Sequence, residues 1–246
     1  MSSSDHWLPS PIPPQIASRE IHVWRAPLNC PDLLLQRLET TLAPDEIARA
    51  DRFFFPLDRQ HFVVARGILR QLLAGYLRRS PTDIEFAYHP RGKPYLAPST
   101  GDPPIAFNIS HSHDMALLAF SVGRELGVDI ERIRPDIAAD EIASRYFSPQ
   151  EVAELQSLPP EQRPEAFCLC WTRKEAYIKA RGEGLQIPLV SFRVSLTPGQ
   201  EVVLESPDAS RWWLRSLSPA PDYAAAVVAE GHDSQLSRFD WHPESS

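Results

Sequence analysis

Hydrophobic and polar residues alternate along this chain with two different periods, and the first part of the chain shows mainly the helical one. Apolar residues recur every three to four positions over residues 57–79, which predicts a long amphipathic helix. The same period at residues 31–42 and 45–54 predicts two shorter helices. Before them, polar and apolar residues alternate one by one at residues 20–25, as in a half-buried strand.

From residue 84 the period becomes two, which is typical of short strands separated by Gly and Pro turns. The chain then repeats the order of its first part, with one strand, a block of helices and a final set of strands. Helices packed on small antiparallel sheets predict an α+β fold. The predicted strands cover residues 84–88, 94–96, 105–110, 115–122, 126–131, 192–196, 201–205, 211–217 and 223–229, and the later helices lie within residues 138–181.

The repeated order of elements predicts a pseudo-dimer, that is, two similar halves in one chain. We place the N-terminal half at residues 19–125 and the C-terminal half at residues 126–246, on element order alone. Residues 1–18 precede both halves and hold four prolines within six positions, at 9, 11, 13 and 14. This composition predicts a tail or an arm that wraps around the rest of the chain.

Charge and cysteine content narrow the function classes. The net charge is −7, and all of the excess negative charge falls after residue 125, which argues against a nucleic-acid-binding protein because such proteins neutralise phosphates with Lys and Arg. Three cysteines, Cys30, Cys168 and Cys170, are too few for a disulfide framework. No export signal or apolar stretch of roughly 18 residues is present. We expect a cytoplasmic, monomeric protein that contacts no membrane and no nucleic acid.

The strand at residues 127–131 carries two carboxylates on one face, Asp129 and Glu131. Such a pair is repulsive unless a cation or basic groups compensate. Hard carboxylate oxygens suit magnesium, which commonly keeps waters and substrate phosphates in its shell. Taken alone, the same pattern is also typical of a solvated strand end.

The helix predicted at residues 167–181 aligns three side chains at intervals of four, Trp171, Glu175 and Lys179. An exposed ion pair worth only about 0.3–0.5 kcal/mol is one interpretation of Glu175 and Lys179. The other is functional, since a carboxylate and an ammonium so spaced can serve a metal ion and a phosphate oxygen together. The glycine-rich segment that follows the helix favours the functional interpretation.

Polar side chains also gather where the strand at residues 105–110 ends. Ser110 can donate a hydrogen bond to a phosphate oxygen, and so can His111. A zinc site at His111 and His113 is an alternative, although no Cys or third His is placed to complete it.

Basic residues supply further candidates for phosphate binding. Arg91 and Lys93 lie two positions apart around a glycine, where they would grip a terminal phosphate or simply form a solvated hairpin turn. Arg49 is either a surface charge or a phosphate ligand, and its spacing does not decide between the two.

Five motifs occur in a fixed order, RGKPYL, FNISHS, GVDIERIRP, RYFSPQEVAEL and WTRKEAYIKARGEGL. With these motifs the chain resembles the Sfp-type 4'-phosphopantetheinyl transferases over about 190 residues. The resemblance implies a pseudo-dimer of two α+β halves with coenzyme A bound in the cleft between them. It also implies an apo acyl or peptidyl carrier protein as the partner.

The resemblance assigns roles to individual residues. Asp129, Glu131 and Glu175 would hold magnesium. Glu175, Lys179 and His111 would be catalytic. The residues implied in binding coenzyme A are Arg49, Arg91, Lys93, Ser110, His111, Asp129 and Lys179.

The implied reaction is attack of a carrier serine on the phosphorus next to the pantetheine arm, which releases adenosine 3',5'-bisphosphate. Glu175 would deprotonate the serine, directly or through a water, and Lys179 would stabilise or protonate the leaving phosphate. Two alternatives are a metal-dependent phosphoesterase, which would use water in place of the serine, and a non-catalytic module that binds coenzyme A or carrier proteins.

Overall fold

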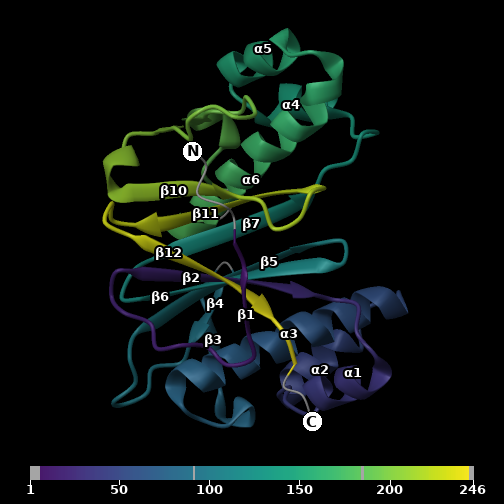
Figure 1. Cartoon of the computed structure of the whole chain (residues 1–246), viewed down its shortest axis with the longest axis vertical. Coiled ribbons are helices and arrows are strands. Elements are labelled where there is room, and N and C mark those ends of the chain that lie inside the picture. Colours follow the sequence, from purple (N-terminus) through teal and green to yellow (C-terminus); the bar gives the residue numbers. More distant parts are fainter. Residues whose placement is uncertain (1–5, 91, 184–185, 244–246) are drawn as a thin grey trace.

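The computed structural model describes residues 6–90, 92–183 and 186–243. Two β-sheets face each other in the middle of the molecule, and helices cover the outer face of each sheet (Figure 1). This arrangement confirms the predicted α+β class. That the two halves are copies of one unit with a ligand cleft between them stays a prediction.

The helices of the first half are α1 (Asp32–Glu39), α2 (Pro44–Ala50) and α3 (Pro56–Leu77), and those of the second are α4 (Ala139–Tyr146), α5 (Pro149–Ser157) and α6 (Arg163–Arg181). The strands are β1 (Leu8–Ser10), β2 (Glu20–Pro27), β3 (Phe86–Tyr88), β4 (Pro94–Leu96), β5 (Ile105–Ser112), β6 (Met115–Val122), β7 (Leu126–Arg132), β8 (Arg193–Val194), β9 (Leu204–Glu205), β10 (Trp212–Leu217), β11 (Tyr223–Glu230) and β12 (Gln235–Trp241). In the described part of the chain, no helix is long and apolar enough to cross a membrane.

The first sheet has the strand order β1-β12-β2-β6-β5, and the second has the order β10-β11-β7. Strands β3 and β4 form a separate hairpin, as do the very short β8 and β9. The strands predicted at residues 192–196 and 201–205 therefore shrink to two residues each.

Three apolar clusters hold these layers together. One lies between α3 and the first sheet, and another lies between α6 and the second sheet. The third fills the space between the two sheets, where Val23 and Leu117 of the first sheet pack with Val128 and Val227 of the second. Because β2, β6, β7 and β11 each give side chains to this third cluster, the two sheets form one continuous interior.

Strands β1 and β12 were not predicted. Strand β12 runs parallel to β2 and inserts between β2 and β1, so the C-terminal segment completes the sheet of the first half. In β12 only Phe239 and Trp241 are buried, and its first four residues do not alternate in burial, which is why the sequence pattern was too weak.

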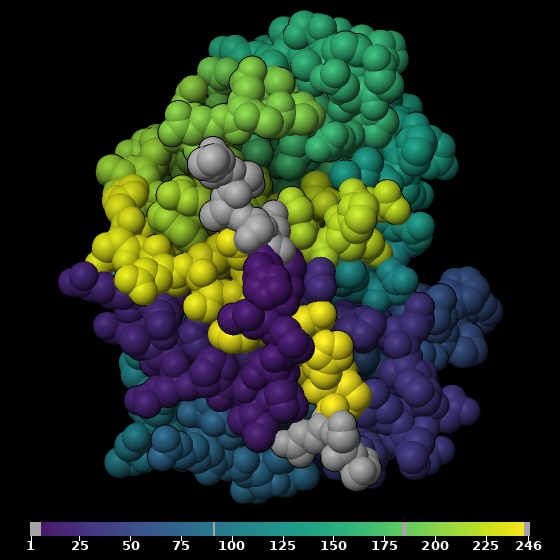
Figure 2. Space-filling model, viewed as in Figure 1, coloured from purple at the N-terminus to yellow at the C-terminus, as the bar shows by residue number. Residues whose placement is uncertain are grey.

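The described part of the proline-rich segment packs against the rest of the chain. Trp7 is buried between the sheets, and Pro13 rests against Gly75 of α3. Figure 2 shows this segment lying over the C-terminal strand on the face in view.

Candidate active site

Two edge strands, β5 of the first sheet and β7 of the second, meet through side chains. Three alternate residues of β5 point toward β7, and each forms a hydrogen bond with that strand. Asn108 Oδ1 accepts a hydrogen bond from the amide of Val128 at 2.9 Å, Ser110 Oγ donates to Asp129 Oδ1 at 2.8 Å, and Ser112 Oγ donates to Glu131 Oε2 at 2.9 Å. The two halves of the chain are therefore joined by polar contacts directly beside the predicted acidic pair.

Gly127 determines how closely α6 lies on β7. A Cβ atom at this position would collide with the backbone of Ala176 and Ala180 in α6. A residue without a side chain is therefore required here, and its absence lets the helix backbone rest on the strand. This close approach brings the last turns of α6 next to Asp129.

The stripe predicted on α6 is present. Trp171, Glu175 and Lys179 are each half-buried, whereas the three residues after Trp171 and the three after Glu175 are buried. The stripe therefore follows the one side of α6 that reaches the edge of the core.

Lys179 connects the helix to both strands. Its Nζ donates to Asp129 Oδ1 at 2.6 Å, to Ser110 Oγ at 3.0 Å and to the carbonyl of Val128 at 3.4 Å. The ammonium thus sits between β5 and β7, and its side chain keeps 29% exposure while that of Asp129 keeps only 5%. An accessible cation held over a buried carboxylate is suited to contact an anionic ligand.

Asp129 has one carboxylate oxygen that the protein leaves unsatisfied. Oδ1 receives Lys179 and Ser110, but Oδ2 is buried and has no hydrogen-bond partner among the described residues. Burial raises the pKa of this carboxyl, and the positive charge of Lys179 opposes that rise. A buried, unpaired oxygen costs free energy, so a ligand at Oδ2 would remove an existing penalty.

Glu131 and Glu175 experience the same acidic surroundings. Burial raises the pKa of both carboxyls, and the charge of Asp129 raises each of them further. The charge of Asp129 thus disfavours ionisation of both glutamates, and carboxylate oxygens, one of them buried and unsatisfied, are the donor type that a divalent cation prefers. Within the described ranges, however, no three His, Cys, Asp or Glu side chains are grouped as a metal site. His111 and His113, the alternative zinc ligands, therefore have no third ligand among the described residues.

His111 occupies the other face of β5 from Ser110 and is exposed. Its pKa is lowered by desolvation and by the charges of His61 and Lys179, while Asp58 opposes the effect. The imidazole is therefore neutral at pH 7 and carries a single N–H donor.

The predicted phosphate-binding arginines and lysine lie in different surroundings. Lys93 donates to the carbonyl of Lys179 at 2.8 Å, to the carbonyl of Leu126 at 3.2 Å and to Glu125 Oε2 at 3.3 Å, so its ammonium fastens the β3–β4 hairpin to the end of α6. Arg91 lies outside the described residues. Arg49 is placed over the ring of Phe62 at 5.2 Å.

Sequence reasoning missed three contributors to this site, Asn108, Ser112 and Gly127. The signal for the first two was present, because polar residues alternate through IAFNISHS at positions 108, 110 and 112. The packing of Gly127 against α6 left no local signal.

The pattern of the 4'-phosphopantetheinyl transferase superfamily matches residues 125–228, and that of a 4'-phosphopantetheinyl transferase N-terminal domain matches residues 31–123. The chain is 41% identical to the 4'-phosphopantetheinyl transferase HetI of Nostoc sp. over 238 residues, which cover 97% of this chain and 96% of the relative. It is 30% identical to the 4'-phosphopantetheinyl transferase Sfp of Bacillus subtilis over 80% of this chain and 86% of the relative.

Among solved structures, a holo-(acyl-carrier-protein) synthase from Bacillus anthracis in complex with CoA (3',5'-ADP) aligns with 43% of this chain and 94% of its own, at 20% identity and a TM-score of 0.36. This likeness is too distant to add to the argument. The two sequence patterns and the near full-length relative show that this chain belongs to the 4'-phosphopantetheinyl transferase family.

Proposed function

We propose that this chain transfers the 4'-phosphopantetheine group of coenzyme A to a serine of an apo acyl or peptidyl carrier protein in a magnesium-dependent reaction. Membership of the family supports the transfer itself. The observation that carries the residue assignment is the unsatisfied Asp129 Oδ2, which lies in a carboxylate set beside the ammonium of Lys179.

Asp129, Glu131 and Glu175 are the proposed magnesium ligands. Their oxygens are the donor type that magnesium prefers, burial raises the pKa of all three carboxyls, and the charge of Asp129 raises the pKa of Glu131 and Glu175 further. When bound there, magnesium would neutralise charge on the pyrophosphate of coenzyme A.

Lys179 and Ser110 are proposed to bind the same pyrophosphate. Both groups now bond to each other and to Asp129 Oδ1, so they are held in position before a substrate arrives. His111 adds a neutral N–H donor from the other face of β5. Such preorganised donors stabilise charge that develops on phosphate oxygens without reorganising during the reaction.

The proton and the leaving group have separate proposed acceptors. The serine oxygen forms a bond to the phosphorus next to the pantetheine arm, and the bond from that phosphorus to the oxygen of the adenosine 5'-phosphate breaks. Glu175 takes the serine proton, directly or through a water, with the carboxylate oxygen that magnesium leaves free. Lys179 stabilises or protonates the departing phosphate.

The proposed state of the enzyme is a cytoplasmic monomer. All the groups above come from β5, β7 and α6 of one chain, so a single copy supplies the whole site. Cys30, Cys168 and Cys170 are free thiols, which is consistent with a reducing compartment.

The test is transfer of labelled pantetheine from coenzyme A to a panel of apo carrier proteins, with magnesium and with a chelator. We expect labelled carrier only when magnesium is present. Hydrolysis of coenzyme A at the same rate without a carrier would assign a phosphoesterase instead. Binding of coenzyme A or carrier with no turnover would assign a non-catalytic module.

A further inference from the structure

The connection between α2 and α3 exposes an unusual amount of aromatic surface. Phe53, Phe54 and Phe55 are 39%, 89% and 60% exposed, and Leu57 one turn later is 54% exposed. Taking about 200 Å² for a fully exposed Phe, the three rings together present roughly 400 Å² of apolar surface to solvent. That is as large as the largest patch on a typical monomer, and such patches commonly mark interaction sites.

This aromatic patch, Phe53–Phe55, is held in place. The rings of Phe54 and Phe55 meet edge to face with centroids 4.9 Å apart, and Phe53 packs against Phe62 of α3 at 5.5 Å. Below the patch, Arg59 bonds to Asp51 at 3.0 Å and to Glu39 at 2.5 Å, which fixes the start of α3 to the two helices before it. The rings are therefore presented by a braced segment and lose little conformational entropy on binding.

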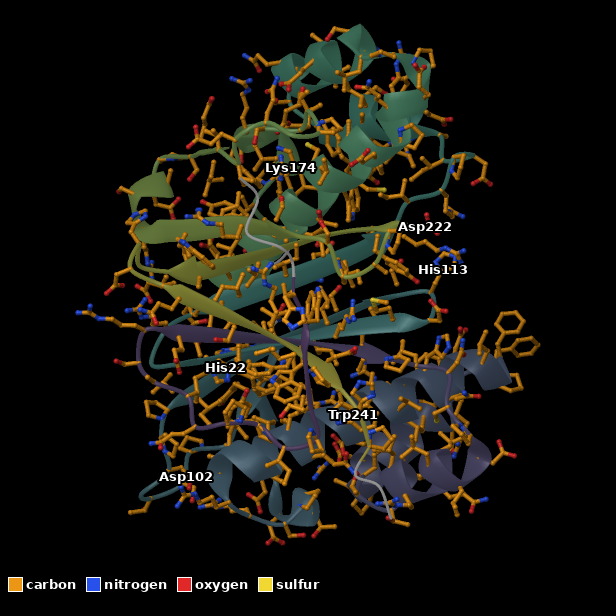
Figure 3. The ribbon with its side chains drawn as sticks, in the orientation of Figure 1. His22, Asp102, His113, Lys174, Asp222 and Trp241 are labelled. Atoms are coloured by element: carbon orange, nitrogen blue, oxygen red, sulfur yellow. The ribbon has the colours of Figure 1, made fainter. Side chains whose placement is uncertain are left out.

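The patch lies at the His111 end of the candidate active site. Phe55 precedes the first residue of α3, and the charges of Asp58 and His61, in the first turns of that helix, act on His111 of β5. In Figures 1 and 3, the N-terminal end of α3 and the β5–β6 turn with His113 lie on the same side of the molecule.

The second half offers apolar surface at the same turn. A cavity of about 370 Å³ is lined by His113, Glu131 and Trp171 together with Ile142. Tyr146, which is 41% exposed, packs edge to face on Trp171 with centroids 5.8 Å apart. Apolar groups of both halves thus flank the region where Glu131 and the α6 stripe meet.

We propose that Phe54 and Phe55 form a docking surface for the acceptor carrier protein, packing against an apolar patch beside the serine that receives the phosphopantetheine group. This proposal rests on the proposed function, because it requires a protein acceptor. A protein whose serine reaches Glu175 must cover the surface around the site, and a stable interface needs about 800 Å² from each partner. Together with Phe53, these rings supply roughly half of that area, and aromatic residues are among those that most often dominate binding energy.

The experiment compares F54S and F54S/F55S with the wild-type chain. The matched control is L33S, because Leu33 is another highly exposed apolar residue, 71% exposed at the start of α1, outside the aromatic patch. The measurements are the KM for apo carrier, the KM for coenzyme A, and direct binding of a carrier whose acceptor serine is Ala. We expect F54S to raise the carrier KM and the carrier Kd at least tenfold, with the KM for coenzyme A within twofold of wild type and L33S unchanged.

A carrier KM and Kd that do not change in F54S/F55S would overturn the docking proposal while leaving the proposed function standing. Carrier binding without transfer by the wild-type chain would overturn the proposed function but not the docking surface. Sedimentation of the wild type as a dimer and of F54S as a monomer would assign the patch to a second copy. Flotation of the wild type, but not of F54S, with phospholipid vesicles would assign it to a membrane surface.

Discussion

Ser110 on β5 donates a hydrogen bond of 2.8 Å to Asp129 on β7, and so joins two strands that belong to different sheets. The same hydroxyl accepts from Lys179 at 3.0 Å, which makes it the meeting point of β5, β7 and α6. Ser110 therefore contributes both to the contact between the two halves and to the orientation of the candidate catalytic groups.

Replacing Ser110 by Ala should weaken both properties. Hydrogen bonds to charged groups contribute about 1.5–3 kcal/mol, so we expect the free energy of unfolding to fall by up to that amount. Because Ser110 is also a proposed phosphate ligand, kcat/KM for coenzyme A should fall about 10- to 100-fold. Urea unfolding and steady-state kinetics measure the two effects. S112A, which removes a similar bond to Glu131, is the matched control and should leave the KM for coenzyme A closer to wild type.

Gly127→Ala should be strongly destabilising because the new methyl group meets the α6 backbone, which cannot rotate away. We expect a loss of about 3 kcal/mol or more in the free energy of unfolding, at the upper end of overpacking effects. The control is Gly199→Ala, where φ is +78° and the surrounding space is empty. Only backbone strain of about 1–2 kcal/mol is expected there. Equal losses in the two variants would show that β7 and α6 do not need this close approach.

The sequence predicted the elements whose burial follows a simple period, and it predicted the acidic strand and the α6 stripe for the same reason. Alternation along one strand places Asp129 and Glu131 on the same face, so this pair could be predicted from the local sequence. The role of Gly127 and the insertion of β12 beside β2 could not be predicted in this way, because both arise from contacts between segments that are far apart in sequence. Lys93 shows the same limit, since its three acceptors lie in β7, in α6 and in Glu125 just before β7.

Magnesium should stabilise the folded chain, and more so at neutral pH than at acidic pH. Burial raises the pKa of the Asp129, Glu131 and Glu175 carboxyls, so the folded chain binds more protons than the unfolded chain between an unfolded pKa of about 4 and the raised folded values. The favourable contribution of these three carboxyls to the free energy of unfolding is fully present below about pH 4, and it is lost as the pH rises through their pKa values in the folded chain. Without magnesium, stability should therefore decline over that range.

Magnesium at 100 times its Kd at pH 7.5 should add about 2.7 kcal/mol at that pH, measured as a rise in Tm, and the same magnesium concentration should add much less at pH 5, where protonated carboxyls bind it more weakly. Asp129→Asn should abolish the magnesium-dependent rise and the transfer reaction, and it should retain the fold. A magnesium effect of equal size in wild type and D129N would place the ion elsewhere.

Lys174 and Lys179 lie on the same helix, and substituting each should separate stability from activity. Lys174 is fully buried, pairs with Glu151 at 2.8 Å and donates to the carbonyls of Leu189 and Phe192. Lys174→Met would leave a buried carboxylate unpaired, so we expect a loss of about 3–5 kcal/mol in the free energy of unfolding.

Lys179→Met removes an ammonium that keeps 29% exposure, and the Asp129 carboxyl left behind, whose pKa burial raises, can take up a proton and keep its hydrogen bond with Ser110, so the loss of stability should be smaller than in K174M. Loss of the Lys179 ammonium should instead lower kcat by about 10²–10³-fold, as removal of a charge-stabilising donor does, and change the KM for coenzyme A less. Thermal unfolding and kinetics on both variants check the contrast. An unchanged kcat in K179M would remove this lysine from the mechanism, because its contacts with Ser110 and Asp129 would then serve only to hold β5, β7 and α6 together.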